Sequence, residues 1–410
     1  MPLARRLGLT DAVFVGLGSM IGAGVFAAFA PAARAAGAGL LPALAVAAVV
    51  AYCNATSSAR LAARYPESGG TYVYGRARLG DFWGYLAGWG FITGKTASCA
   101  AMTLTVVAYA APDLGKPWRT VLAVCVVALV TSVNYLGVHR SALATRVIVC
   151  ITLVVLTVVS VAAVSSDHTT VAFSPFFGNG VLEAAGLLFF AFAGYARLAT
   201  LGEEVRDPAR TIPRAIPIAL ACTLVVYAAI ALVLLTTLGP ARLGQRTDPL
   251  AEAAPWPWLA PIVRIGATVA ALGSLLALVL GVSRTMLAMS RDGHLPRALS
   301  AVHPRFQVPH RAELTVGVVV AILASFTDLR GAIGFSSFAV LAYYAIANAA
   351  AMTLRHTEGT TRRFIAIAVV GLIGCLVLAF SLPLTSVLAG VAVLGIGAAA
   401  YGIRRMRPRH

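Results

Sequence analysis

The chain has 410 residues, of which 59% are hydrophobic and 11% are charged. Because about a quarter of the residues in a water-soluble domain are charged, this composition excludes such a domain and indicates a chain whose solvent is mostly lipid. The net charge of +17 comes from Arg residues in short loops between apolar runs, where membrane topology favours them, and this placement argues against nucleic-acid binding.

Apolar stretches long enough to cross a bilayer recur along the whole chain. We expect each of them to be a helix, because every backbone polar group in lipid must be satisfied within its own span. No hydrophilic stretch is long enough for a soluble domain, so residues 1–410 are predicted to form one membrane domain. The twelve predicted spans are 11–33, 38–62, 81–109, 120–138, 144–164, 181–202, 215–239, 261–287, 313–327, 332–354, 363–382 and 385–403.

The segments outside the spans predict the orientation of the chain. Met1–Thr10 is short and basic and has no cleavage signature, so no removable signal peptide is expected. Arg residues concentrate in the loops on the N-terminal side and in the C-terminal tail, which predicts that both termini of this multi-pass protein lie in the cytoplasm. The six Cys residues lie inside apolar runs without metal-ligand spacing, so no disulfide, metal or other cofactor is expected.

The first span contains four glycines within nine residues, from Gly16 to Gly24. Each glycine costs a helix about 1 kcal/mol relative to alanine, so the run indicates a helix interruption in mid-membrane. Freed peptide groups and the positive end of the following half-helix can hold a carboxylate. The alternative is close helix packing through the small residues Gly18 and Gly22. The residues alone favour neither interpretation.

The sixth span holds a second candidate for an interruption, Phe189–Ala196, which contains the single glycine Gly194. One glycine is weak evidence for a break. However, the first span opens the chain and the sixth opens a second set of five spans. Interruptions at matching positions of two halves are the best sequence indication of a transporter site.

Five segments carry a resemblance to a known family. They are the glycine-rich Gly18–Phe26, the loop Tyr65–Tyr72, the pair Gly88–Trp89, the stretch Glu203–Pro208 with Ile212–Pro213, and the loop Ser283–Pro296. In this order they resemble the motifs of the amino acid–polyamine–organocation superfamily of transporters, and the resemblance covers nearly the whole chain.

The resemblance implies an all-α membrane fold with a five-plus-five inverted repeat, 11–164 and 181–354, and two additional helices at 363–403. It also implies that helices 1 and 6 are discontinuous and that a substrate binds at mid-membrane between helices 1, 3, 6 and 8. By carry-over, the substrate carboxylate would meet the amides of Ser19, Met20, Ile21, Gly22, Ala23 and Gly24. Its amine would meet carbonyls of Phe190, Ala191, Phe192 and Ala193, beside Gly194. Phe190 and Tyr195 would be gating aromatics, although aromatic residues in a span more often serve packing.

Lys95 lies about halfway along the third span, where a lysine cannot easily reach an interface. Ionisable groups inside the bilayer are costly, and a buried lysine is able to exchange protons. We hypothesise that Lys95 is the titrating coupling group or contacts an anionic part of the substrate. The alternative is a structural lysine satisfied by carbonyls. Some proton-coupled relatives carry a lysine in helix five instead, at the position of Thr152.

Arg197 follows the predicted break in the sixth span and stays charged at any physiological pH. Three roles are open for it. It could close a cytoplasmic gate by pairing with Glu203 or Glu204, it could bind substrate, or it could be a cation at a helix end.

These features predict a secondary transporter that works by alternating access. Mid-membrane cations without an acid favour proton-coupled uptake of a neutral amino acid over a dibasic one. The alternative is exchange of amino acids and amines, including cationic amino acids or polyamines. The spans hold no His, Asp and Glu constellation for an enzyme, no repeated filter sequence for a channel, and no large domain for a receptor.

Overall fold

The computed structural model describes residues 7–65, 67, 69–137, 142–164, 178, 180–199, 205–354 and 361–406. Within these ranges all regular elements are helices, joined by turns and irregular loops, apart from an isolated β-bridge between Leu7 and Val205. Eleven of the described helical segments are long and apolar enough to cross a membrane. The prediction of an all-helical, multi-pass membrane protein is therefore confirmed.

The first half of the chain runs from α1 to α8. Its elements are α1 (Leu9–Ile21), α2 (Gly24–Ala27), α3 (Phe29–Ala36), η1 (Gly37–Gly39), α4 (Leu40–Arg64), α5 (Thr71–Leu79), α6 (Asp81–Ala110), α7 (Lys116–Tyr135) and α8 (Ala142–Val164). The first predicted span thus consists of three pieces. The prediction missed α5, a short helix with a polar sequence in the loop between α4 and α6.

The second half runs from α9 to α17. Its elements are α9 (Val181–Phe192), η2 (Ala193–Tyr195), α10 (Ala196–Ala199), α11 (Pro208–Leu243), α12 (Pro249–Glu252), α13 (Leu259–Arg291), η3 (Arg297–Ser300), α14 (His310–Phe326), α15 (Leu329–Met352), α16 (Arg362–Ser381) and α17 (Leu384–Met406). Each predicted span overlaps one of these helices. The predicted short ninth span corresponds to α14, which has 17 residues.

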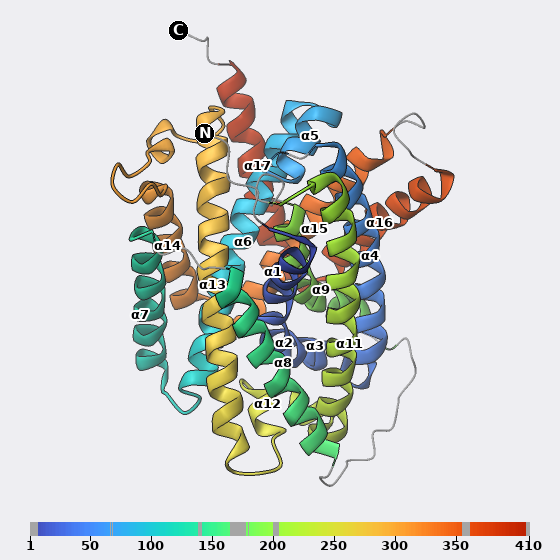
Figure 1. Cartoon of the computed structure of the whole chain (residues 1–410), viewed down its shortest axis with the longest axis vertical. Coiled ribbons are helices and arrows are strands. Elements are labelled where there is room, and N and C mark those ends of the chain that lie inside the picture. The colour runs from blue at the N-terminus through green and yellow to red at the C-terminus, as the bar shows by residue number, and fades with distance from the viewer. Residues whose placement is uncertain are drawn as a thin grey trace.

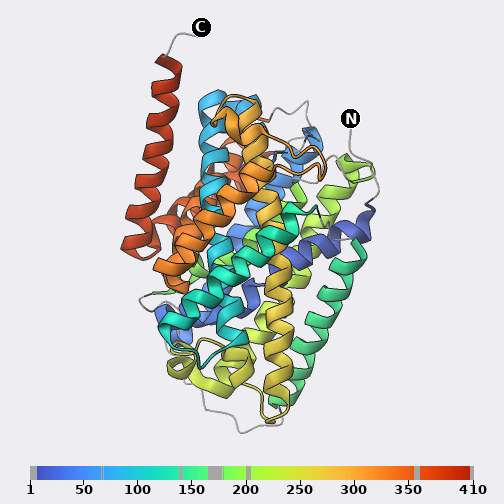
Figure 2. The same ribbon diagram turned by 90° about the vertical axis from the view of Figure 1, so that its left-hand side faces the viewer.

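Burial separates central from peripheral helices. In α6 and α15 the most apolar windows are 83% buried, whereas that of α17 is 22% buried. Figure 1 shows α6 and α15 running through the bundle, and Figure 2 shows α17, in red, standing at one side. The side chains that could surround a site therefore come from helices before α16.

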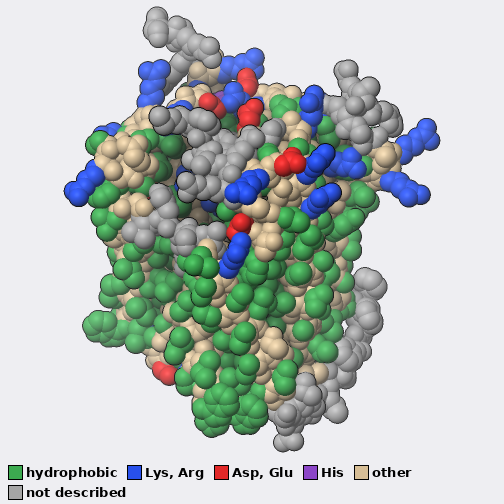
Figure 3. Space-filling model, viewed as in Figure 1, with side chains coloured by type: hydrophobic (Ala, Val, Ile, Leu, Met, Phe, Trp, Pro, Cys, Tyr) green, Lys and Arg blue, Asp and Glu red, His purple; other side chains and the backbone are tan. Residues whose placement is uncertain are grey.

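In Figures 1 and 2, α17 ends at the upper end of the bundle and α1 begins in the same half, and we call this upper end the termini end. On the face shown in Figure 3, Lys and Arg side chains gather at this end, and hydrophobic side chains cover the body below it. An apolar body with a basic rim at one end is the distribution expected for a protein inserted in a bilayer.

A polar cluster at the termini end joins α5 to the loop that follows α13. The Tyr72 hydroxyl donates to Asp292 Oδ2 at 2.5 Å and lies 2.8 Å from His294 Nδ1. The Arg76 guanidinium donates to Asp292 at 2.7 Å and to Asp81 at 3.2 Å. Burial, together with the positive charge of Arg76, lowers the pKa of the His294 imidazole, so the neutral form is favoured. The cluster joins α5 to the start of α6 and to the loop after α13.

Candidate functional site

The first helix is interrupted inside the predicted glycine segment. α1 ends at Ile21, Gly22 and Ala23 form a turn, and α2 begins at Gly24. α2 is only four residues long and is followed by a bend at Ala28 before α3 starts. The interruption places irregular backbone deep in the bundle, where it is tolerated only if protein or a cavity surrounds it.

The second predicted break is milder than the first. α9 ends at Phe192, the chain tightens into the 3₁₀ turn η2, and α10 continues from Ala196. The backbone does not unwind into an extended segment here. Ala193, at the end of α9, has helical dihedral angles (φ −62°, ψ −2°). A 3₁₀ segment within a helix still redirects carbonyls, and such segments often mark functional hinges.

The two interruptions touch each other through glycines. A Cβ on Gly194 would lie 2.3 Å from the carbonyl oxygen of Ser19, and a Cβ on Gly24 would lie 2.7 Å from Cα of Ala191. The contacts between the two interruptions involve Gly24 and Gly194, whereas Gly18 and Gly22, the pair in the packing interpretation, face side chains of α8 and α13. The helix is interrupted, and Gly24 and Gly194 allow its backbone to approach α9 and η2 closely.

Side chains from three other helices donate hydrogen bonds to carbonyls at the interruptions. The Tyr227 hydroxyl on α11 lies 2.6 Å from Met20 O and 3.1 Å from Ala191 O, so its proton is shared between both broken helices. Three further donors act on single carbonyls. They are Ser274 to Gly18 O at 3.0 Å, Lys95 to Ala193 O at 3.1 Å, and Tyr109 to Phe26 O at 3.4 Å.

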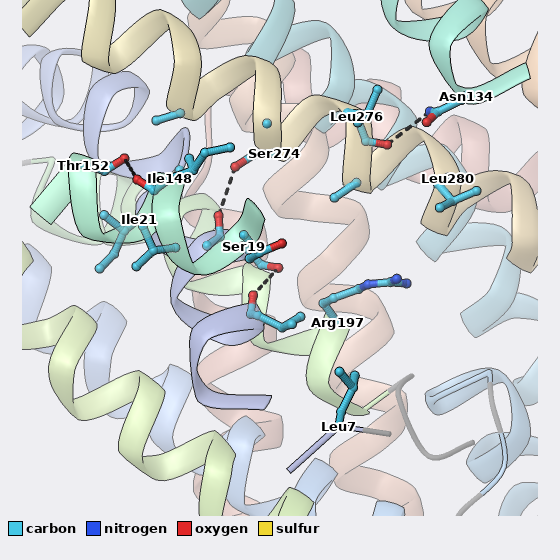
Figure 4. Close-up of a pocket in the computed structure, with 18 of the residues that line it drawn as sticks. Leu7, Ser19, Ile21, Asn134, Ile148, Thr152, Arg197, Ser274, Leu276 and Leu280 are labelled. Carbon is cyan, nitrogen blue, oxygen red and sulfur yellow. Dashed lines mark hydrogen bonds between the residues drawn. The ribbon is translucent and has the colours of Figure 1, made fainter. Parts of the chain in front are cut away.

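Two cavities flank the interruptions. The larger has a volume of about 380 Å³, within the range of small-molecule sites. The smaller has about 210 Å³ and is shown in Figure 4, with Thr152 on α8 and Ser274 on α13 around it. Predicted residues that line the larger one are Ser19, Gly24, Phe190, Ala191, Ala193, Gly194, Lys95 and Arg197. Those that line the smaller one are Ser19, Ile21, Gly22, Thr152 and Arg197.

The remaining predicted residues contribute to packing in this conformation. Among the described residues, the lining of the two cavities does not include Met20, Ala23, Phe192 or Tyr195, and all four side chains are buried. The Tyr195 ring lies 5.0 Å from the Tyr344 ring on α15. Of the two predicted gating aromatics, Phe190 therefore faces a cavity and Tyr195 faces α15.

The two predicted charged residues, Lys95 and Arg197, differ in their positions around the cavities. Lys95 is 5% exposed near the middle of α6 and lines the larger cavity. Arg197 lines both cavities and reaches from α10 toward α13, where its Nη1 would lie 3.5 Å from a Cβ on Gly281 (Figure 4). Its suggested partners Glu203 and Glu204 lie outside the described residues. The Thr152 hydroxyl donates to Ile148 O of its own helix at 2.8 Å.

Sequence reasoning missed three polar residues around the site. Tyr227 and Ser274 are hydroxyl-bearing residues in mainly apolar spans, and each span contains other Ser or Thr residues, so no local signal singles them out. The third is Glu313, in the first turn of α14. It is fully buried, neither carboxylate oxygen has a hydrogen-bond partner among the described residues, and the charge of Arg284 on α13 acts on it.

Comparisons with known proteins place the chain among amino acid permeases. A family model described as amino acid permease matches residues 7–399. An uncharacterized transporter of Mycobacterium tuberculosis is 67% identical over 99% of this chain and 93% of its own length. The branched-chain amino acid permease BcaP of Bacillus subtilis is 29% identical over 96% of this chain and 86% of its own. The chloroplastic cationic amino acid transporter 7 of Arabidopsis thaliana is 29% identical over 88% of this chain and 67% of its own length.

Replacing Gly22 by Ala is expected to lower the melting temperature of the purified protein, because the added Cβ would lie 1.8 Å from Ser274 Oγ. Gly18→Ala is the matched control. Its Cβ would lie 3.2 Å from methyl groups of Thr145 and Val149, which can shift slightly. Thermal unfolding followed by intrinsic fluorescence measures both variants. Equal melting temperatures would contradict the close approach of α1 and α13.

Tyr227→Phe is expected to destabilise the fold by about 1–3 kcal/mol, because Met20 O and Ala191 O lose their hydroxyl donor in a buried place. Tyr52→Phe is the control, since the Tyr52 side chain is exposed at the surface of α4. Thermal unfolding of the two variants side by side gives the comparison. A Tyr227→Phe protein as stable as the control would show that the shared hydroxyl does not hold the two broken helices together.

Proposed function

Because the chain belongs to the amino acid permease family, within the amino acid–polyamine–organocation superfamily, we propose that it carries an amino acid across the membrane by alternating access. One observation supports this proposal above the others. The 380 Å³ cavity is lined by backbone of both interrupted helices and by the charged side chains Lys95 and Arg197. A site of this kind offers peptide dipoles and fixed charges to a zwitterion in the middle of a bilayer.

The proposed substrate is a neutral amino acid. Its carboxylate is assigned to the peptide groups of the first break, Ser19–Gly24, and its amine to the carbonyls near η2. Arg197, which lines the cavity, favours the carboxylate, and the two cations Lys95 and Arg197 together disfavour a dibasic side chain. The branched-chain permease among the relatives fits this assignment, whereas the cationic amino acid transporter represents the alternative, an exchanger of amino acids or amines.

We further propose that 11–164 and 181–354 are two inverted repeats and that 363–403 lies outside this core. The two interruptions support the proposal, because each falls in the first helix of its half and the two are in contact. The low burial of α17 supports a peripheral role for the last helix of the chain. In the proposed cycle α1, α4, α9 and α11 move against the other helices.

The termini end is assigned to the cytoplasm, on the basis of the Arg residues that gather there. The larger cavity is also lined by Arg291, Gln307 and Pro309, from the end of α13 and the loop before α14. Near the opposite end of α6, the Tyr109 hydroxyl bonds to Phe26 O and its ring packs against the Phe26 ring. The described conformation therefore fits a carrier open toward the cytoplasm.

Transport by purified protein in liposomes tests the proposed function. Radiolabelled neutral amino acids are offered outside, with a proton gradient in one set of vesicles and internal unlabelled amino acid in another. Uptake above that of vesicles carrying Gly22→Leu protein is expected, because a large side chain there fills the space between α1 and Ser274. Uptake only against internal amino acid would identify an exchanger. Failure of every amino acid in both sets would refute the proposal.

Proton coupling through Lys95 is tested by Lys95→Met. Uptake by the unmodified protein is expected to change with pH, and uptake by the variant is expected to be independent of pH, because its side chain at position 95 no longer titrates. Lys116→Met is the control, since the only other lysine of the chain is exposed at the start of α7. Initial uptake rates across a pH series measure the effect. An unaltered pH profile in Lys95→Met would exclude the coupling role.

A further inference from the structure

Lys95 is held in the membrane interior by a backbone carbonyl. Its side chain is buried in the middle of α6, and Nζ donates to Ala193 O at 3.1 Å. Ala193 is the first residue of the 3₁₀ turn η2, so this carbonyl belongs to the interruption of the sixth span. Both Lys95 and Ala193 line the larger cavity. A carbonyl in that cavity is thus occupied by a primary ammonium group of the protein itself.

Neighbouring carbonyls at the interruptions differ from Ala193 O in their donors. Met20 O and Ala191 O share the hydroxyl of Tyr227, a fully buried side chain that is not part of the lining of either cavity. The Ala193 carbonyl instead receives its hydrogen bond from a flexible, cavity-lining side chain. It is therefore the acceptor that a small molecule in the cavity can take over without breaking the contact between the two broken helices.

We propose that Lys95 stands in for the ammonium group of the substrate at Ala193 O when the cavity is empty, and that a bound substrate displaces it. The inference rests on the proposed function and names the group of the substrate that competes with the protein. Two ammonium groups on one carbonyl oxygen would lie only a few ångströms apart and repel each other strongly away from bulk water. Occupation of the carbonyl by Lys95 and by a substrate amine is therefore mutually exclusive.

Lys95 is packed along α6 on one side and faces the 380 Å³ cavity on the other, so its side chain has room to move only into the cavity. Cys99 lies one turn further along α6 and is fully buried, and the Ser98 hydroxyl pairs with Ser336 on α15 at 2.6 Å. Arg197 lines the same cavity and repels a protonated lysine that moves toward it. The lysine has a long unbranched side chain, so a change of rotamer is enough to release the carbonyl.

Selective labelling can follow this exchange, because Lys95 and Lys116 are the only lysines in the chain. Full-length protein carrying [¹³Cε]-lysine gives two side-chain signals, and Lys95→Met assigns them. Each of the twenty amino acids is added, followed by the carboxylic acid that lacks only the amine of the amino acid that binds. The Lys95 signal is expected to shift with the amino acid and not with its amine-free analogue, while the exposed Lys116 signal stays constant.

Affinity provides the second measurement. Removing the competing ammonium in Lys95→Met should tighten binding of the amino acid about tenfold, the order expected when a charge-assisted hydrogen bond no longer has to be displaced. Lys95→Arg keeps a cation near Ala193 O and should show no gain. Weaker or unchanged binding by a folded Lys95→Met protein would overturn the proposal, as that result fits a lysine that binds the substrate carboxylate or serves the fold alone.

The two experiments separate this inference from the proposed function. If no amino acid binds the unmodified protein or either variant, the proposed function fails and the inference fails with it. If an amino acid binds but the Lys95 signal does not move, only the inference fails. If Lys95→Met does not fold, the signals are assigned with Lys116→Met, because the signal that remains in that variant belongs to Lys95. The titration of the unmodified protein with the amino acid and its amine-free analogue then tests the inference without the affinity measurement.

Discussion

The structure depends on one constraint, which is that a peptide carbonyl within lipid must accept a hydrogen bond. An intact helix satisfies its own carbonyls, and interrupted helices need donors from outside. In this chain the donors at the interruptions are side chains of neighbouring helices: Tyr227, Ser274, Lys95 and Tyr109. The positions of α6, α11 and α13 are thus tied to specific carbonyls of α1, α2, α9 or η2.

The donors fall into two groups that differ in what they connect. Tyr227 on α11 joins α1 to α9, which are two members of the proposed moving unit. Lys95, Ser274 and Tyr109 come from α6 and α13, on the other side of the cavity, and each makes a single hydrogen bond to a broken helix. The interface across the cavity therefore contains bonds that can be exchanged one at a time. Within the moving unit, the bond at Tyr227 is shielded from the cavity.

The helices and the location of the first interruption could be predicted from the sequence. Apolar length determines a span, and glycines weaken a helix wherever they occur, so both signals are local. The same holds for Lys95, whose place near the middle of α6 follows from counting residues. The partner of Lys95 could not be predicted, because Ala193 is distant in sequence and is brought near by packing. Local signals also gave no reason to expect that η2 stays helical in its dihedral angles or that Tyr195 turns toward α15.

The shared hydroxyl of Tyr227 has a consequence for how the carrier changes shape. Since one hydroxyl serves both α1 and α9, separating these helices would leave at least one of the two carbonyls without its donor in an apolar interior. The half of the site formed by the two breaks is therefore expected to travel as a rigid body, with its own geometry preserved. The surface that selects the substrate would then be the same in every state of the transport cycle. Only the opposite side of the cavity, formed by α6 and α13, would differ between the substrate-bound and the empty protein.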